Sequence, residues 1–262
     1  MGKPYAHVYN CTAQELIGLE PRRWGLIITD PPYTAHVHRN VKTNKKRKGR
    51  PVRDIRLVFA PLRGHLHDRN IPGELGLDWL PPALERTDRW VISFCSLGQL
   101  GDYQFIAGRA YVRHGTMGRK NPMPQQSGDR PAQESEGVAI MHRPCPTAWR
   151  AEHPGEKWLR WNGRVKQDGT RGRGMPARWV RGGRVGSKGE HTHPTQKPEE
   201  VIEDMILAFA EPGDLIVDPF AGAGTTLRVA QRLGFDSVGA DCGTCIKTGR
   251  PWADIANERL NQ

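Results

Sequence analysis

Residues 213–226 read Gly-Asp-Leu-Ile-Val-Asp-Pro-Phe-Ala-Gly-Ala-Gly-Thr-Thr, and this stretch fixes the fold class. Leu215–Val217 is a short apolar run typical of a buried parallel strand, and a glycine-rich loop follows it. Thr225–Leu233 is expected to form a helix, and a second apolar strand is expected at Ser237–Ala240. Strand and helix therefore alternate, which predicts an α/β fold with right-handed crossovers and a mostly parallel sheet.

The glycine-rich loop indicates a ligand site, because glycines let the backbone approach a ligand beside a helix N-terminus. A dinucleotide site needs a third glycine at position 227, which is leucine, and a P-loop needs lysine where Thr225 stands. The acid at the strand end, Asp218, suits a cationic ligand instead. Asp241, after the next strand, can accept hydrogen bonds from two ribose hydroxyls. An ordinary turn is the alternative for the glycines alone.

A second motif, Asp30-Pro31-Pro32-Tyr33, follows an apolar run at residues 25–29 that predicts a buried strand. The exocyclic amino nitrogen of a nucleobase is a poor nucleophile, because its lone pair is delocalised into the ring. A carboxylate and the Pro31 carbonyl, accepting its two N–H bonds, would localise that lone pair. Tyr33 offers a flat face for a base rotated out of the duplex. Standing alone, the tetrapeptide would read as a turn with a capping aspartate.

Together, Asp30–Tyr33, His193–Pro198 and Asp218–Thr226 resemble the motifs of amino-methylating (N6-adenine or N4-cytosine) DNA methyltransferases. The catalytic tetrapeptide comes first and the cofactor loop last, an order that resembles the β class. The resemblance implies an α/β, Rossmann-like sheet with helices on both faces, a circularly permuted motif order and an inserted target-recognition region. It also implies S-adenosylmethionine as cofactor, double-stranded DNA as partner and a homodimer as a candidate state.

The resemblance assigns roles to individual residues. The catalytic residues are Asp30, Pro31, Pro32 and Tyr33. The cofactor contacts are Asp218, Phe220, Gly222, Gly224, Thr225 and Asp241, with Thr195 and Lys197 from the preceding segment. Family members often carry Gly-Asp after the first strand, where this chain has Asn10 and Cys11, so these two are included as candidate cofactor contacts.

Basic residues dominate two segments of this 262-residue chain, whose formal net charge is +11. Such an excess favours nucleic acid as a partner. Residues 36–63 predict a mobile basic loop, and residues 143–192 predict an irregular or β-rich insertion that reads the target sequence. Four tryptophans in the insertion favour a small core over base stacking, and Asn162 and Gln167 are candidate base readers. The predicted DNA contacts are Lys45, Lys46, Arg47, Lys48, Arg160, Arg164, Arg171 and Arg173.

The remaining chain divides around that insertion. Residues 1–142 are predicted to form the catalytic half of the core, and residues 193–262 the cofactor half. The pattern predicts a helix near 75–87 interrupted by two prolines, strands at 89–95, 109–113 and 138–142, helices at 97–107 and 253–260, and a long polar loop at 115–137.

Five scattered cysteines do not form a disulfide framework, and no apolar run approaches the roughly 20 residues that span a bilayer. We therefore expect no membrane association and a location in the cytoplasm of a bacterium or a phage-infected cell, near the nucleoid. Cys242 and Cys245 are half a zinc site, and His142 with Cys145 could supply the other half. Unrelated loop cysteines are the favoured interpretation, so no metal is expected.

The expected function is site-specific transfer of a methyl group from S-adenosylmethionine to N6 of adenine in double-stranded DNA, after base flipping. The alternative is N4 of cytosine, which needs the same geometry. An RNA or protein amino methyltransferase, or a non-catalytic DNA-binding protein that kept the fold, is less favoured.

Overall fold

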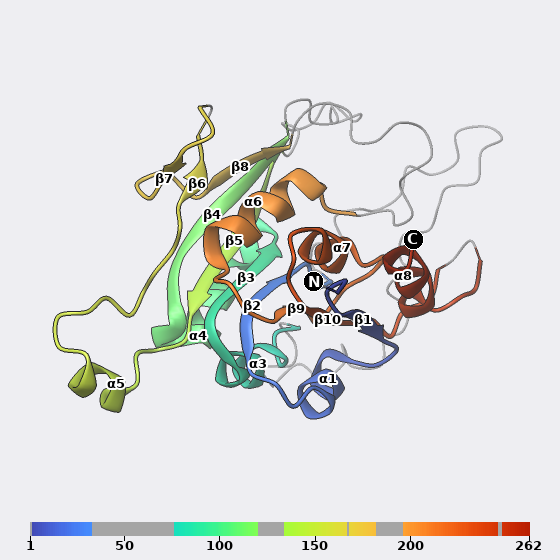
Figure 1. Ribbon diagram of the computed structural model, residues 1–262, viewed down its shortest axis with the longest axis horizontal. Helices are drawn as coiled ribbons and strands as arrows, with labels where there is room; N and C mark the ends of the chain where they lie inside the picture. Colours follow the sequence, from blue (N-terminus) through green and yellow to red (C-terminus); the bar gives the residue numbers. More distant parts are fainter. Residues whose placement is uncertain (1, 33–75, 120–133, 167, 182–195, 246–247) are drawn as a thin grey trace.

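The computed structural model describes residues 2–32, 76–119, 134–166, 168–181, 196–245 and 248–262 (Figure 1). Its centre is an eight-stranded sheet in the order β1-β10-β9-β2-β3-β5-β4-β8. Neighbouring strands are parallel except at the two pairs that β5 makes, with β3 and with β4. The prediction of an α/β fold with a mostly parallel sheet is confirmed.

The strands of the main sheet have the following bounds: β1 Ala6–Tyr9, β2 Trp24–Thr29, β3 Thr87–Cys95, β4 Tyr111–Arg119, β5 Ser135–His142, β8 Arg178–Arg181, β9 Ile216–Asp218 and β10 Ser237–Ala240. A separate two-stranded sheet pairs β6 Arg164–Val165 with β7 Arg171–Gly172. The helices are α1 Ala13–Leu19, α3 Leu80–Arg86, α4 Leu100–Ala107, α5 Thr147–Glu152, α6 Glu199–Phe209, α7 Thr225–Arg232 and α8 Trp252–Leu260, with short 3-10 turns at Leu97–Gln99 and Gly108–Ala110.

Helices cover both faces of the sheet (Figure 1). Helices α1, α3 and α4 pack on one face against Ile27, Val91 and Val217. Helices α6 and α7 pack on the other face against residues that include Leu26 and Ile28. Successive residues of a strand point to opposite faces, so the fully buried β2 contributes to both cores. The predicted Rossmann-like arrangement is confirmed.

Two predictions about local structure are wrong. Pro81 and Pro82 do not interrupt a helix; they lie in the first turn of α3, where the missing N–H groups have no helical partner to lose. The predicted loop at 115–137 is partly strand, because β4 continues to Arg119 and β5 begins at Ser135. The register pairs Gly118 with Ser135, and residues 120–133 lie outside the described part of the chain.

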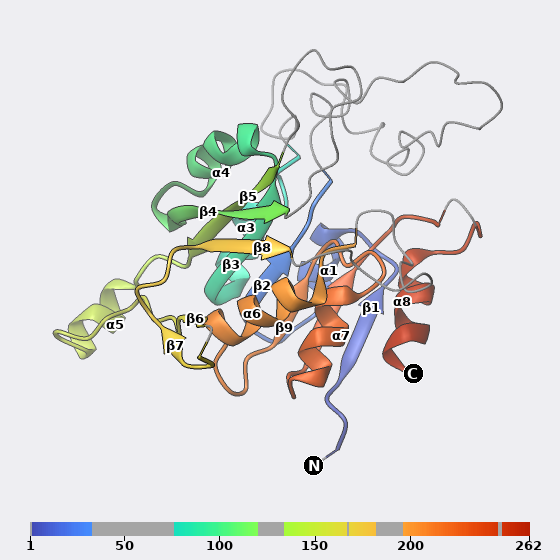
Figure 2. The ribbon, with the colours of Figure 1, turned by 90° about the horizontal axis from the view of Figure 1, so that it is seen from above.

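Residues 143–181 lie at one end of the sheet, and α8 lies at the other (Figures 1 and 2). The segment is not wholly separate from the core: β8 extends the main sheet by pairing with β4, and Trp179 is buried in the second core. This differs from the expected insertion because one strand of the segment completes the sheet. The boundaries at 142 and 192 and the target-recognition role stay predictions.

The chain reverses its direction of travel across the sheet between β9 and β2. From β9 it passes through α7 to β10 on one side, and β3 lies beside β2 on the other. In open α/β sheets ligands bind in the crevice at such a switch point, outside the carboxyl ends of the strands. None of the described helices combines the length and hydropathy needed to cross a membrane.

Candidate active site

The two acidic motifs meet at the switch point. Ile27 of β2 pairs with Val217 of β9, so both strands end at the same edge. The Thr29 hydroxyl donates a 2.7 Å hydrogen bond to Oδ1 of Asp218. Asp30, the next residue, therefore lies beside the glycine-rich loop, although the two motifs are nearly 190 residues apart.

Asp218 is enclosed within the protein, with only 4% of its surface exposed. Its Oδ1 also accepts the backbone N–H of Phe220 at 3.1 Å. Burial raises the pKa of this carboxyl to about 6, against the hydrogen bonds from Thr29 and Thr226, which lower it. Asp218 thus braces the loop from within, and its predicted contact with a cationic ligand stays a prediction.

Asp241 closes the far side of the glycine-rich loop. Its two carboxylate oxygens accept the N–H groups of Gly222 at 2.9 Å and of Gly243 at 2.8 Å. Burial raises its pKa, and these two hydrogen bonds oppose the rise. Gly224 has φ +77° at the start of α7, where a Cβ would also meet the Cβ of Ala256 at 3.0 Å. The loop therefore depends on glycine at this position.

The other predicted cofactor residues border the same edge. Phe220 packs edge-on against the buried Trp79, with ring centroids 5.5 Å apart. Thr225 begins α7 and is buried. Asn10 and Cys11 follow β1, which pairs with β10, so they lie next to the Asp241 loop. The structure therefore brings these residues to one edge without testing what they bind.

Lys197 lies against Asp30. Its Nζ donates to Oδ2 of Asp30 at 2.6 Å and lies 3.1 Å from Oε2 of Glu136. It also lies 5.0 Å from the centre of the Phe94 ring. Burial lowers the pKa of Lys197, but the two carboxylates outweigh it and hold the pKa above its ordinary value. The sequence interpretation assigned Lys197 to the cofactor, and it did not find Glu136 at all.

Glu136 was missed because the sequence interpretation put it in a loop. No signal in the sequence marked this position, because it follows from the antiparallel pairing of β5 with β3, by which β5 begins at the edge where β3 ends. Gly137 pairs with Cys95, the last residue of β3, so an acid just before Gly137 must lie at the carboxyl edge of the sheet.

The structure describes only part of the catalytic tetrapeptide. Pro31 is buried and Pro32 is half-buried beside Asp30. Tyr33, Thr195 and the basic residues Lys45 to Lys48 lie outside the described residues.

Three of the four predicted DNA-contacting arginines in the second basic segment bind within the protein. Arg164 pairs with Asp204 at 2.7 Å and lies over the Trp179 ring at 5.4 Å. Arg171 donates to the Leu207 carbonyl at 2.8 Å. Arg160 forms an exposed pair with Glu156. Such intramolecular partners do not favour a DNA role, least of all for the shielded Arg164.

Asn162, a candidate base reader, also has a structural role. Its Nδ2 donates to the carbonyls of Ala210 at 2.8 Å and Leu207 at 3.3 Å. These are carbonyls at the end of α6 that have no partner within the helix. The amide therefore caps α6, and these intramolecular contacts do not favour the base-reading role, which stays a prediction. Gln167 is not among the described residues.

The tryptophans of the segment pack against protein. Trp149 and Trp158 lie edge-to-face at 4.9 Å, and Trp158 continues the contact to His142 at 5.7 Å. Trp161 packs against the second core, which holds Trp179. Packing was the favoured prediction, but the core they join is mainly that of the sheet. Within the described ranges, no group of His, Cys, Asp or Glu side chains is arranged to hold a metal ion.

Comparisons with known proteins match this chain to DNA methylases. The sequence model of the N6/N4 DNA methylase family matches residues 97–247. The chain is 57% identical over 68 residues to the type II methyltransferase M2.DpnII of Streptococcus pneumoniae, covering 26% of this chain and 23% of that protein. It is 46% identical over 70 residues to M2.LlaDCHI of Lactococcus lactis subsp. cremoris, covering 27% and 24%. The chain thus spans about a quarter of the length of these relatives.

The fold has a close counterpart among solved structures. The M1.HpyAVI–SAM complex superposes with a TM-score of 0.63 at 20% identity, covering 98% of this chain and 100% of that one. At this identity the likeness is one of fold.

Proposed function

This chain belongs to the N6/N4 family of DNA methylases, and from that premise we propose that it transfers a methyl group from S-adenosylmethionine to N6 of adenine in double-stranded DNA. The observation that carries the proposal is the bridge from Thr29 to Asp218, which sets Asp30 beside the glycine-rich loop. A catalytic carboxylate and a cofactor loop need this adjacency, because a direct transfer requires donor and acceptor in contact.

The residues at the edge fit the proposed cofactor. Its ammonium and sulfonium groups are cationic, and its ribose carries two hydroxyl donors. Asp218 and Asp241 supply carboxylates on the two sides of the loop, and each Asp241 oxygen keeps a second lone pair after accepting one N–H group. Gly222 and Gly224 have no side chains to block an approach. When bound, the cofactor supplies a methyl group activated by the sulfonium.

Asp30 and the Pro31 carbonyl would act on the target base. Each accepts one N–H of the exocyclic amino group, so the nitrogen lone pair is turned away from the ring and toward the methyl donor. Tyr33 would stack on the flipped base. Positioning and electrostatics supply the acceleration, and the extra proton leaves the nitrogen after transfer.

Tritiated methyl transfer to DNA tests the proposal, with nucleoside analysis of the product. We expect N6-methyladenine. N4-methylcytosine would instead support the alternative, an N4-cytosine methyltransferase, because the family includes both specificities. DNA binding without any transfer would support a non-catalytic protein, and the proposal would be wrong.

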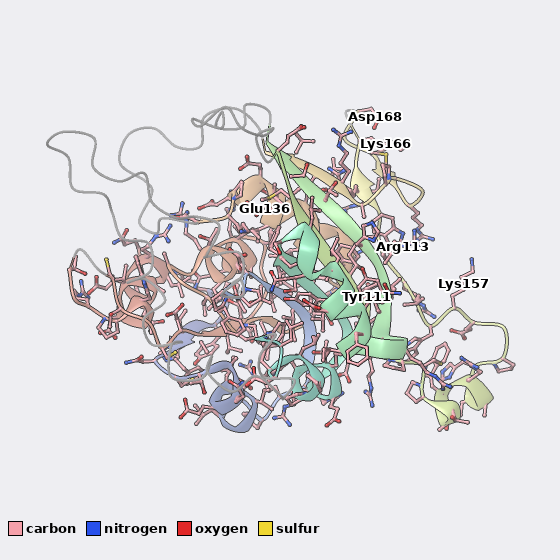
Figure 3. All side chains as sticks on the ribbon, turned by 180° about the vertical axis from the view of Figure 1, so that it is seen from behind. Tyr111, Arg113, Glu136, Lys157, Lys166 and Asp168 are labelled. Carbon is pink, nitrogen blue, oxygen red and sulfur yellow. The ribbon has the colours of Figure 1, made fainter. Side chains whose placement is uncertain are left out.

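We further propose that residues 143–192 contact the target DNA. Lys157 and Lys166 are exposed on this segment (Figure 3), and so is Arg173. Duplex phosphates attract such cations. Replacing these three residues with alanine should weaken binding to all sequences and lower the salt dependence.

A further inference from the structure

The Lys197 ammonium contacts groups from three other parts of the chain. Asp30 follows β2, Glu136 lies near the start of β5 (Figure 3), Phe94 belongs to β3, and Lys197 itself precedes α6. The side chain of Lys197 is 12% exposed, and those of Asp30 and Glu136 are 23% and 13% exposed. Charges this enclosed interact more strongly than surface pairs, because solvent screens them less.

Among the described residues, the Lys197 cation lies between the two anions Asp30 and Glu136. Both carboxylates contact the same Nζ, so Asp30 and Glu136 would repel each other across a short gap without it. The Phe94 ring face adds a cation–π contact on a further side. The ammonium thus contacts the predicted catalytic carboxylate directly. A residue that only bound the cofactor would not need this contact, so Lys197 has a role at Asp30 itself.

We propose that Lys197 and Glu136 are positioning residues for Asp30: Lys197 holds the Asp30 carboxylate oriented and ionised, and Glu136 holds Lys197 in place. This inference rests on the proposed function, in which an ionised Asp30 accepts an N–H bond from the base. It predicts that the two residues have opposite electrostatic effects on Asp30, because one is a cation and the other an anion.

Other titratable groups also face Asp30, so they must be distinguished from this pair. Burial raises the pKa of Cys95 to about 12 and raises that of Tyr103, so both stay neutral at the pH of the assay. Burial raises the pKa of Asp218 to about 6. Asp218 is common to every variant below, so differences between the variants report on Asp30.

The experiment measures the pH profile of kcat for the full-length chain and its variants on DNA. In Lys197→Met, Asp30 loses its cation and keeps the repulsion from Glu136, so its pKa rises by about 1–3 units. Activity needs the ionised form, so the acid limb moves to higher pH. In Glu136→Gln the repulsion disappears, so the limb moves to lower pH. Adding Glu136→Gln to Lys197→Met should move the limb part of the way back.

Two further variants separate positioning from structure. Lys197→Arg keeps the cation and should retain kcat within about fivefold, if a charge near Asp30 is what matters. Glu203→Gln removes a carboxylate from the exposed pair with Arg232 and serves as the matched control for Glu136→Gln; its acid limb should not move. The affinity of Lys197→Met for S-adenosylmethionine should stay within about twofold of the wild type, whereas a direct cofactor contact would lower it by roughly tenfold or more.

A second readout does not depend on activity. The ¹³C carboxyl resonance that disappears in Asp30→Asn reports the ionisation of Asp30, and its titration should move up in Lys197→Met. In Lys197→Met, an unchanged titration of Asp30 or an unchanged acid limb would overturn the inference, and so would an upward shift in Glu136→Gln. If the wild type itself transfers no methyl group, the proposed function fails, and the ¹³C titration still tests the pair. If Lys197→Met does not fold, Glu136→Gln carries the test: a downward shift supports the inference, and an upward shift or no shift overturns it.

Discussion

The switch-point edge and the basic segment 143–181 differ in what fixes their side chains. At the edge, Asp30 and Asp241 follow the buried strands β2 and β10, and Asp218 ends the buried strand β9. The parallel pairing of those strands fixes where each residue lies. In the basic segment, long side chains reach partners that are far away in sequence, as Arg164 reaches Asp204. Residues placed by the backbone can be predicted from a motif, whereas the partners of long, flexible side chains cannot.

The largest effect should come from Asp30 at the edge. We expect Asp30→Ala to lower kcat by roughly a thousandfold, because removing one aimed hydrogen-bonding group from a transition state costs about 10²–10³. Affinity for S-adenosylmethionine should change by less than about threefold, since Asp30 acts on the base. Asp78→Ala, which removes an exposed carboxylate bonded to Gln14, is the control. Near-normal turnover in Asp30→Ala would show that Asp30 is not catalytic. The switch-point edge would then lose the residue on which its comparison with the basic segment depends.

The second effect concerns stability. Burial raises the pKa of Asp218 from 3.8 to about 6, so the folded protein binds a proton more tightly than the unfolded chain. The unfolding free energy should therefore fall as the pH rises from about 4 through about 6, by as much as about 3 kcal/mol at 1.36 kcal/mol per unit. Asp218→Asn should lack this part of the slope, and Asp78→Asn should keep it. Urea denaturation between pH 4 and pH 7.5 measures both, and equal slopes in all three proteins would contradict the burial argument.

The third effect is on cofactor affinity. Asp241→Ala should weaken S-adenosylmethionine binding by about 10–100-fold, because a hydrogen bond to a charged group contributes about 1.5–3 kcal/mol. The same substitution releases the N–H groups of Gly222 and Gly243, so the loop also loosens. Asp241→Asn, which keeps one acceptor oxygen, should lose less. Calorimetry measures whether the affinity falls in the order wild type, Asp241→Asn, Asp241→Ala. Unchanged affinity in Asp241→Ala would show that Asp241 does not bind the cofactor.

Most of the sheet could be predicted from the sequence, because apolar runs such as 25–29 and 215–217 mark buried parallel strands. The loop after β9 and the acids after β2 and β10 followed from the same runs. The strand β8 could not be predicted, since Arg178–Arg181 carries only two apolar residues, and one of them, Val180, is 40% exposed. An edge strand buries one face at most, so its hydrophobic pattern is short and weak.

The partners of side chains in the candidate site could not be predicted from the sequence either. Lys197 was found by its motif, but its partner could not be, because the contact with Glu136 joins residues 61 positions apart through two side-chain ends. Asn162 read as a base-edge reader because amides do address adenine. Only the structure shows that the amide lies at the end of α6, where the helix carbonyls need a donor.

The smallest effect should separate two arginines of the basic segment that the sequence cannot tell apart. Arg164 pairs with Asp204, and their side chains are 19% and 15% exposed. Arg173 is exposed, and no intramolecular ion pair joins it to another described residue. The same residue type therefore occupies a structural position and a position open to DNA.

Arg164→Ala should lower the unfolding free energy by about 1–3 kcal/mol, because it leaves the Asp204 carboxylate shielded without its partner. The methylated sequence should stay the same. Arg173→Ala should leave stability within about 0.5 kcal/mol and weaken DNA binding by roughly tenfold. If Arg173 reads a base, preference should relax at one position of the site; if it binds a phosphate, all sequences should weaken alike. Methylome sequencing of DNA from a methylation-free host expressing each variant, with denaturation of the purified proteins, measures both outcomes. A relaxed preference in Arg164→Ala at unchanged stability would show that the ion pair with Asp204 opens to DNA, and the contrast between the two arginines would then be wrong.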